Sequence, residues 1–349
     1  MRQQVALTLQ DLLPVQASDQ VCEKFGVHAD LGAVHGLYND EDLIFFANTG
    51  VMSRPVTKKN YNLLTQTQLF AHNHMQREAK RVDPYDTNSG TGVLGRVADV
   101  LTKNGNNVGS FSVDRYSIAL IGKPGMSDAP MIVNRNGVPD KYLDDISDYI
   151  PNLHKETTAD SGYFGETWSA SLIEGLSTND VLSAELKNVE VGTAFPNSYL
   201  ARQLETVARL IATRESRGVD TDVFYVETGG KCWVKCVDSI IHQKFSSLTL
   251  FFLVGFDTHS NVEENLSARF IGVNEGIEAF AAELKRLRVW NNVTTIQTSD
   301  FARTLNPNGG DGTGKFCMLT IIHNAAKHNI CLYDPFCCFP TTIRPRVGR

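Results

Sequence analysis

The chain has 349 residues, of which 42% are apolar, and a formal net charge of −6 at pH 7. This length suits one large or two ordinary domains, and the apolar content is enough for a buried core. An acidic balance argues against a general nucleic-acid binder, whose domain is usually basic. No apolar stretch approaches the ~20 residues of a membrane span, and residues 1–20 lack the apolar core of a signal peptide. We therefore expect no nucleic-acid partner and no membrane span, and the compartment stays unknown.

Strands and helices are predicted to alternate through the first part of the chain. Residues 42–48 form an apolar run typical of a buried strand, and residues 61–81 favour a helix. A glycine-rich turn at 89–95 precedes a helix predicted to start at about Val97, and residues 110–120 read as a strand. This alternation predicts an α/β sandwich with a largely parallel sheet.

The second part of the chain continues the alternation. A helix carries one apolar face and ends at Gly218; its face consists of Leu200, Leu204, Val207, Ala208 and Ile211. Residues 222–227 and 293–298 read as strands, and residues 263–288 between them have the apolar period of an amphipathic helix. Because such crossovers join parallel strands in a right-handed sense, we predict these two strands to be parallel neighbours.

Three polar residues follow these predicted strands. Asp257 and His259 precede the long helix, and Asp300 follows residues 293–298. Open α/β sheets build their sites beyond the carboxyl ends of parallel strands. Carboxylate oxygen and imidazole nitrogen are donors that suit Zn²⁺ or Mn²⁺. The alternative is that Asp257 caps a helix while His259 packs in the core.

Several motifs together carry a resemblance to a known family. They are Gln-Leu-Phe-Ala-His-Asn (68–73), Ser-Gly-Thr-Gly-Val-Leu-Gly-Arg (89–96), Gln-Leu-Glu-Thr-Val-Ala-Arg-Leu-Ile-Ala (203–212), Gly-Phe-Asp-Thr-His-Ser-Asn (255–261), Ser-Asp-Phe-Ala-Arg-Thr (299–304) and Asn-Gly-Gly-Asp-Gly-Thr (308–313). With these motifs the chain resembles the domain-of-unknown-function family numbered 1501, which is grouped with the alkaline phosphatase and sulfatase superfamily of metal-dependent hydrolases. The resemblance covers roughly Met1–Gly230 and Phe256–Thr313. It implies an alkaline-phosphatase-like fold, a three-layer α/β/α sandwich.

The resemblance also implies a function. The chain would be a metal-dependent hydrolase of phosphate or sulfate esters, acting on a small-molecule or polymer substrate. Asp257, His259 and Asp300 would bind Zn²⁺ or Mn²⁺, and Arg303 and His72 would hold the anion, although a salt bridge is an equal reading for Arg303. The catalytic nucleophile cannot be named. The alternative class is a non-catalytic binding or surface-associated protein on the same scaffold.

Two segments depart from the family pattern. Residues 231–255 separate Gly-Gly from Phe-Asp-Thr-His, and residues 314–349 replace the expected continuation; together they hold six of the seven cysteines. Each departure begins at a Gly-Lys pair whose codons can contain a splice-donor signal. We hypothesise that both segments are translated introns in a eukaryotic gene model; the alternative is a lineage-specific insertion and tail.

This hypothesis sets the expected domain organisation. Residues 1–313 would form one domain, interrupted at 231–255 and incomplete at both ends. Residues 314–349 would form a disordered tail. We expect the chain as written to lack hydrolase activity.

Overall fold

The computed structural model describes residues 7–17, 24–47, 51–57, 59–69, 71–86, 90–136, 149, 162–227, 247–252, 256, 261–298 and 318–322. Structural statements below refer to these ranges. They contain a seven-stranded sheet with helices on both faces and a separate antiparallel hairpin of β1 (Leu12–Gln16) and β2 (Lys24–His28). The predicted three-layer α/β/α sandwich is confirmed.

Five neighbouring strands of the sheet are parallel to one another. They run in the order β8, β7, β6, β4, β5, and β9 and β3 extend the β8 side through two antiparallel pairings. The strands, in sheet order, are β3 (Leu43–Ala47), β9 (Met318–Ile322), β8 (Val293–Thr298), β7 (Ser247–Phe252), β6 (Thr221–Glu227), β4 (Val108–Val113) and β5 (Met131–Val133).

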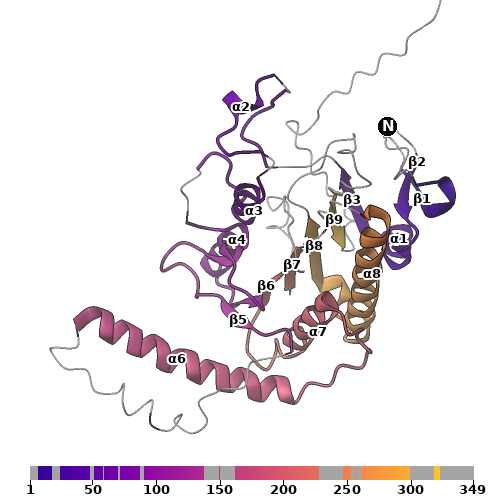
Figure 1. Ribbon diagram of the computed structural model, residues 1–349. Coiled ribbons are helices and arrows are strands. Elements are labelled where there is room, and N and C mark those ends of the chain that lie inside the picture. Colours follow the sequence, from indigo (N-terminus) through magenta and orange to yellow (C-terminus); the bar gives the residue numbers. More distant parts are fainter. Residues whose placement is uncertain are drawn as a thin grey trace, which may run out of the picture.

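Helices cover both faces of the sheet (Figure 1). Each face packs against its helices through a core of its own. Alternate residues of β6 divide between the two cores, because successive strand side chains point to opposite faces. Phe224 and Val226 face the core that α1, α7 and α8 close, and Val223 and Tyr225 face the core that α3 and α4 close. The described helices are α1 (Gly32–Asn39), α2 (Tyr61–Leu64), α3 (His72–Arg81), α4 (Val93–Lys103), α6 (Gly162–Lys187), α7 (Tyr199–Ala212) and α8 (Val262–Arg286), with short 3₁₀ turns η1 (Leu9–Asp11), η2 (Ile118–Leu120) and η3 (Trp290–Asn292).

The helix α6 differs from the others because it extends away from the sheet (Figure 1). Its buried residues are Leu182 and Leu186, both near its carboxyl end. Within the described ranges no helix is long and apolar enough to cross a membrane.

Most predicted elements lie where the sequence places them, and two are shortened. β3, β6, α8 and β8 match their predicted ranges within about two residues, α7 ends at Ala212 rather than at Gly218, and α4 begins at Val93 rather than Val97. The helix expected over 61–81 is divided into α2 and α3, because the Thr65 hydroxyl donates to the Tyr61 carbonyl and Thr65 itself is extended. The strand expected over 110–120 ends at Val113, before Asp114, whose φ of 70° is left-handed.

The structure corrects the expectation that residues 222–227 and 293–298 are neighbouring strands. They are parallel, but β7 lies between them and pairs with both. Its sequence, Ser-Leu-Thr-Leu-Phe-Phe, comes from the 231–255 segment and favours a strand because of its aromatic and apolar content.

Residues 318–322 also differ from expectation. They belong to the segment predicted to be a disordered tail, yet they form β9 between β3 and β8. Residues 231–255 and 314–349 therefore each contribute a strand to the sheet.

Candidate functional site

The carboxyl ends of the five parallel strands meet along one border of the sheet, which we call the carboxyl edge. β4, β5, β6, β7 and β8 end there at Val113, Val133, Glu227, Phe252 and Thr298. In open α/β sheets this border is where ligands bind, because the loops that follow the strands converge there.

A half-buried carboxylate lies at the end of β6. The Tyr225 hydroxyl donates to Glu227 Oε2 at 2.6 Å, and Lys80 Nζ from α3 lies 3.2 Å from the same oxygen. The Lys80 ammonium also lies 5.4 Å from the centre of the Tyr225 ring. The side chains of Lys80 and Glu227 are 16% and 14% exposed, so both stay within reach of solvent.

Tyr225 is held in its protonated form. Burial raises the pKa of its phenol well above 10, and the negative charge of Glu227 raises it further. Tyr225 therefore acts as a hydrogen-bond donor at the carboxyl edge rather than as a nucleophile.

The backbone at the end of β6 is fixed by a buried glutamine of α7. Gln203 Nε2 donates to the Glu227 carbonyl at 3.0 Å, and the Glu227 amide donates to Gln203 Oε1 at 3.2 Å. This pair of hydrogen bonds replaces the ladder partners that the strand loses at its end and fixes the direction in which the chain leaves it.

A second ionic cluster lies at the ends of β4 and β5. Asp114 accepts hydrogen bonds from the Arg135 amide at 2.7 Å and from Arg135 Nη1 at 3.0 Å. The Arg135 guanidinium lies 4.8 Å from the centre of the Tyr199 ring. Burial raises the pKa of Tyr199, as does the negative charge of Asp114.

Arg115 lies between these two clusters. Its positive charge acts on the pKa of both Tyr199 and Tyr225, opposing the effect of burial on each phenol. Its backbone carbonyl accepts a hydrogen bond from the Ser112 hydroxyl, and its side chain is exposed. Among the described residues Arg115 forms no ion pair, so its guanidinium is the cation at this edge that is most accessible to an incoming anion.

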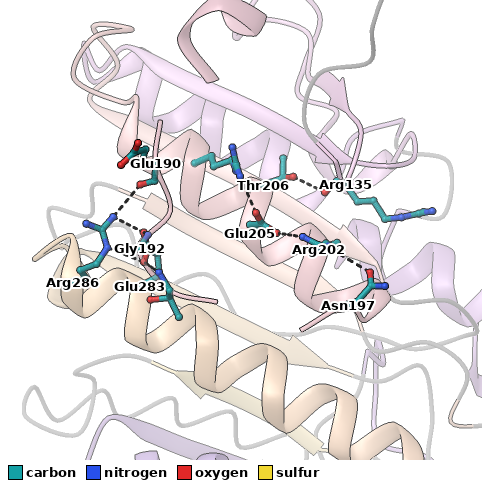
Figure 2. Close-up of polar contacts among 11 residues, drawn as sticks. Arg135, Glu190, Gly192, Asn197, Arg202, Glu205, Thr206, Glu283 and Arg286 are labelled. Carbon is teal, nitrogen blue, oxygen red and sulfur yellow. Dashed lines mark hydrogen bonds and ion pairs between the residues drawn. The ribbon is translucent and has the colours of Figure 1, made fainter. Parts of the chain in front are cut away.

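Two separate groups of polar contacts lie along α7 and at the end of α8 (Figure 2). The Thr206 hydroxyl donates to the Arg135 carbonyl at 2.8 Å and so fixes the chain that leaves β5. Glu205 pairs with Arg202 at 2.7 Å and with Arg209 at 2.9 Å along α7. These contacts orient α7, which carries both Gln203 and Tyr199.

Glu283 on α8 is the centre of the second group (Figure 2). Its carboxylate accepts hydrogen bonds from Arg286 at 2.7 and 2.9 Å and from the Thr193 amide at 3.0 Å. Burial raises the pKa of this carboxyl, but the hydrogen bonds from Arg286 and Thr193 outweigh it and lower the pKa to about 2. An alanine methyl at Gly192 would lie 2.6 Å from Arg286 Cδ, so the absence of a side chain there lets the arginine reach Glu283.

The sequence-predicted site residues fall mostly outside the described ranges. His72 is the first residue of α3, half-buried, on the helix that carries Lys80. Asp257, His259, Asp300 and Arg303 lie outside the described residues. Within the described part of the chain, no three His, Cys, Asp or Glu side chains are close enough to hold a metal ion.

Sequence reasoning missed Glu227 and Lys80 as residues of the carboxyl edge. The sequence does indicate Glu227, because this acidic residue ends a predicted strand. Lys80 gave no such signal, because it is 147 positions away from its partner.

The fold and this edge define an α/β protein whose ionisable side chains gather at the ends of parallel strands. Residues 190–319 match the family described as Protein of unknown function (DUF1501). This supports the family resemblance, and it contains the motifs at 203–212, 255–261, 299–304 and 308–313. No curated protein and no solved structure gave a match.

Proposed function

We propose that the chain is a metal-dependent, hydrolase-like protein of the alkaline phosphatase and sulfatase superfamily, with a site for a phosphate or sulfate ester at the carboxyl edge. The observation that carries the proposal is the convergence of charged side chains at the ends of three neighbouring parallel strands, β6, β4 and β5. Glu227 and Lys80 lie at the end of β6, and Asp114, Arg115 and Arg135 follow β4 and β5.

Arg115 is the side chain best placed to recognise the anion. A guanidinium presents planar, paired donors to two oxygens of a tetrahedral oxyanion, which a lysine ammonium cannot do. Lys80 is already held by Glu227, so we assign it a positioning role. The protonated Tyr225 keeps Glu227 in place through its hydroxyl.

The donor set proposed for the metal agrees with the order of the chain. Asp300 comes two residues after β8, and Asp257 follows Phe256, whose ring is buried and lies 5.7 Å from that of Phe270. β7 and β8 are paired in parallel, so both acidic residues follow neighbouring strands in this chain, and without residues 231–255 Asp257 would follow β6 instead. With His259 they offer the oxygen and nitrogen donors that Zn²⁺ or Mn²⁺ takes. When bound, the ion would polarise the ester.

Metal content and ester turnover test this proposal together. The purified chain would be analysed for zinc and manganese by mass spectrometry, then assayed with p-nitrophenyl phosphate and p-nitrophenyl sulfate. We expect firmly bound metal, and at least a tenfold loss of metal affinity in Asp257→Asn and Asp300→Asn. The control is Asp180→Asn on the exposed face of α6.

Three outcomes separate the candidate functions. Metal-dependent turnover supports the hydrolase and contradicts the expectation that the chain as written is inactive. Metal and phosphate binding without turnover, also in a protein that lacks residues 231–255 and 314–349, favours the alternative, a non-catalytic binding protein on the same scaffold. A chain that binds neither metal nor phosphate contradicts the proposal.

We also propose that residues 231–255 and 314–349 are translated introns. In β7 the Ser247 and Thr249 hydroxyl oxygens are buried without a hydrogen-bond partner, as is that of Thr294 on the adjoining β8. Each such group costs about 1–3 kcal/mol, but Ser110 on β4 has the same unpaired hydroxyl, so this feature is not peculiar to β7. Apolar and aromatic residues favour a strand whatever their origin, which accounts for its pairing.

The mature transcript decides the origin of the segments. We expect Gly230 to be joined directly to Phe256, with the codons for 231–255 and those after residue 313 removed. A transcript that retains both segments would contradict the intron hypothesis. The spliced protein would lack β7, and the hydrolase assays would then be repeated on it.

A further inference from the structure

The helix α6 carries an apolar stripe along one side. Large apolar side chains recur along the helix in steps of three and four residues, which places them on the same face, as in a coiled coil. Exposed acidic residues of α6 fall on the other sides, so the stripe itself carries no charge. The stripe consists of Phe164, Trp168, Leu172, Gly175, Asn179, Leu182 and Leu186, and the exposed acidic residues are Glu166, Glu174 and Asp180.

The two ends of this stripe differ in burial. Leu182 and Leu186 are buried in the core that α7 and α8 close, whereas Phe164 and Trp168 are 87% and 61% exposed. The stripe therefore continues, without a change of face, from a packed surface onto the part of α6 that extends away from the sheet (Figure 1). Clustered exposed apolar side chains of this kind mark a surface that contacts another protein.

The extended part of α6 also needs packing for its own stability. An isolated helix of about 15 residues is marginal in water, because most helical stability comes from burial of an apolar face. Gly165 and Gly175 lower the helix propensity of this part further. A surface that covers Phe164 and Trp168 would therefore stabilise the helix as well as bury its aromatic rings.

We propose that the stripe pairs with the same stripe of a second copy of this chain, with the two α6 helices antiparallel. Trp168 of each copy then faces Leu172 of the other, and Phe164 faces the turn that contains Gly175. The stripe is self-complementary in this arrangement, because the large Phe164 ring meets a glycine whose Cβ position has open space around it. The contact is two-fold symmetric and therefore closes at two copies.

This arrangement leaves room for both copies. The two Leu182 residues lie roughly 36 Å apart along the helix pair at about 1.5 Å per residue, so each sheet is attached at an opposite end of the pair. The exposed acidic residues point away from the shared stripe and stay in solvent, where their mutual repulsion is weak.

The area of the contact predicts a weak dimer. Four aromatic rings, Phe164 and Trp168 from each copy, bury at most roughly 600–1,000 Å² at about 150–250 Å² per side chain. With Leu172 and Leu176 the contact reaches the lower limit of about 1,000 Å² for a specific interface, so we expect reversible association. The proposal does not depend on the hydrolase function, because no residue of the carboxyl edge takes part.

Sedimentation velocity of the full chain over a series of protein concentrations tests the proposal. We expect the average mass to rise from that of one chain towards that of two. Phe164→Ser and Trp168→Ser each remove a ring from both copies and should weaken dimerisation at least about tenfold. Val181→Ser is the matched control, because it removes a 61% exposed apolar side chain from a different side of α6 and should leave dimerisation unchanged. Serine, valine and the aromatic residues have similar helix propensities, so the variants keep the helix equally.

A spectroscopic measurement places the contact on α6. The chain would be labelled with fluorotryptophan and followed by ¹⁹F NMR, with the Trp168 signal assigned by its loss in Trp168→Phe. We expect this signal to shift with protein concentration. The signal of Trp290, which lies beside Lys285 at the end of α8, should stay in place.

Three results would overturn the proposal. A chain that stays monomeric at all concentrations would mean that the stripe is left to a different protein or to the chain itself. Assemblies that grow beyond two copies would contradict a closed two-fold contact. A dimer with equal affinity in Phe164→Ser, Trp168→Ser and Val181→Ser would place the contact elsewhere on the surface.

Discussion

The two borders of the parallel sheet use charge in different ways. At the amino ends of the strands, Asp222 is fully buried and bound by both Nη atoms of Arg217, at 2.7 and 3.1 Å. At the carboxyl edge, Glu227 and Lys80 remain partly exposed and Arg115 is exposed. Charges at the amino ends are satisfied within the protein and stabilise the fold, whereas those at the carboxyl edge stay available to a ligand.

The largest effect on stability is expected at the buried pair. Asp222→Ala leaves the Arg217 guanidinium beside an apolar side chain, and removing one partner of a buried pair costs about 3–5 kcal/mol. Urea denaturation measures this loss. Glu215→Ala removes an acidic residue that is 91% exposed and paired with Arg214, so it should cost less than about 1 kcal/mol. Equal losses of stability in Asp222→Ala and Glu215→Ala would contradict the view that the buried pair at the amino ends stabilises the fold.

The Glu283 carboxylate is expected to make the stability of the fold depend on pH. Its pKa is lowered from 4.5 to about 2 in the folded state, so its stabilisation is complete above pH 4.5 and is lost as pH falls through about 2. The whole shift is worth about 3 kcal/mol, since one unit of pKa corresponds to about 1.4 kcal/mol.

Denaturation at pH 6 and at pH 3 checks this value. The natural chain should lose more stability between the two than Glu283→Gln does, while Glu278→Gln, an exposed position on the same helix, should behave like the natural chain. An identical pH response in all three proteins would show that Glu283 does not carry the effect.

The backbone at Gly109 packs closely against the Asp222–Arg217 pair. A methyl group at Gly109 would lie 2.2 Å from Asp222 Oδ1, so Gly109→Ala should destabilise the fold by about 1–3 kcal/mol. Gly36 in α1 has open space around it, so Gly36→Ala should be neutral or stabilising by about 0.5–1 kcal/mol. Thermal unfolding of the two variants compares them, and the opposite order would contradict the packing described here.

A smaller effect separates two buried threonines. Thr249→Val removes a hydroxyl that has no partner, so it should be neutral or stabilising. Thr206→Val removes the hydrogen bond to the Arg135 carbonyl and should cost about 1 kcal/mol. Denaturation midpoints give both changes in stability. A loss in Thr249→Val as large as that in Thr206→Val would show that the Thr249 hydroxyl has a hydrogen-bond partner in solution.

Sequence reasoning predicted the elements with a long, regular apolar period. α7 and α8 were predicted because their apolar residues recur every three or four positions, and β6 and β8 because they are continuous buried runs. Local chemistry limited the rest. The left-handed backbone at Asp114 ends β4 early, and nothing in the neighbouring residue types indicated it.

The candidate site was predictable in its place but not in its contacts. The prediction of parallel strands implied a shared carboxyl edge, although β7 was not expected between β6 and β8. The Lys80–Glu227 and Asp114–Arg135 pairs join residues that are far apart in the sequence, so their contact depends on packing that periodicity does not encode. The position of β7 was missed because its segment departs from the family pattern, although its residues favour a strand.

Phosphate binding by Arg115→Ala tests the central claim most directly. Titration of inorganic phosphate by calorimetry would compare the natural chain with Arg115→Ala at the carboxyl edge and Arg214→Ala near the amino ends. We expect Arg115→Ala to bind at least about tenfold more weakly, the value of a charge-assisted hydrogen bond, with a stability change below about 0.5 kcal/mol. Arg214→Ala should bind as the natural chain does. Unchanged binding in Arg115→Ala, or an equal loss in both variants, would contradict the assignment of the carboxyl edge as the anion site.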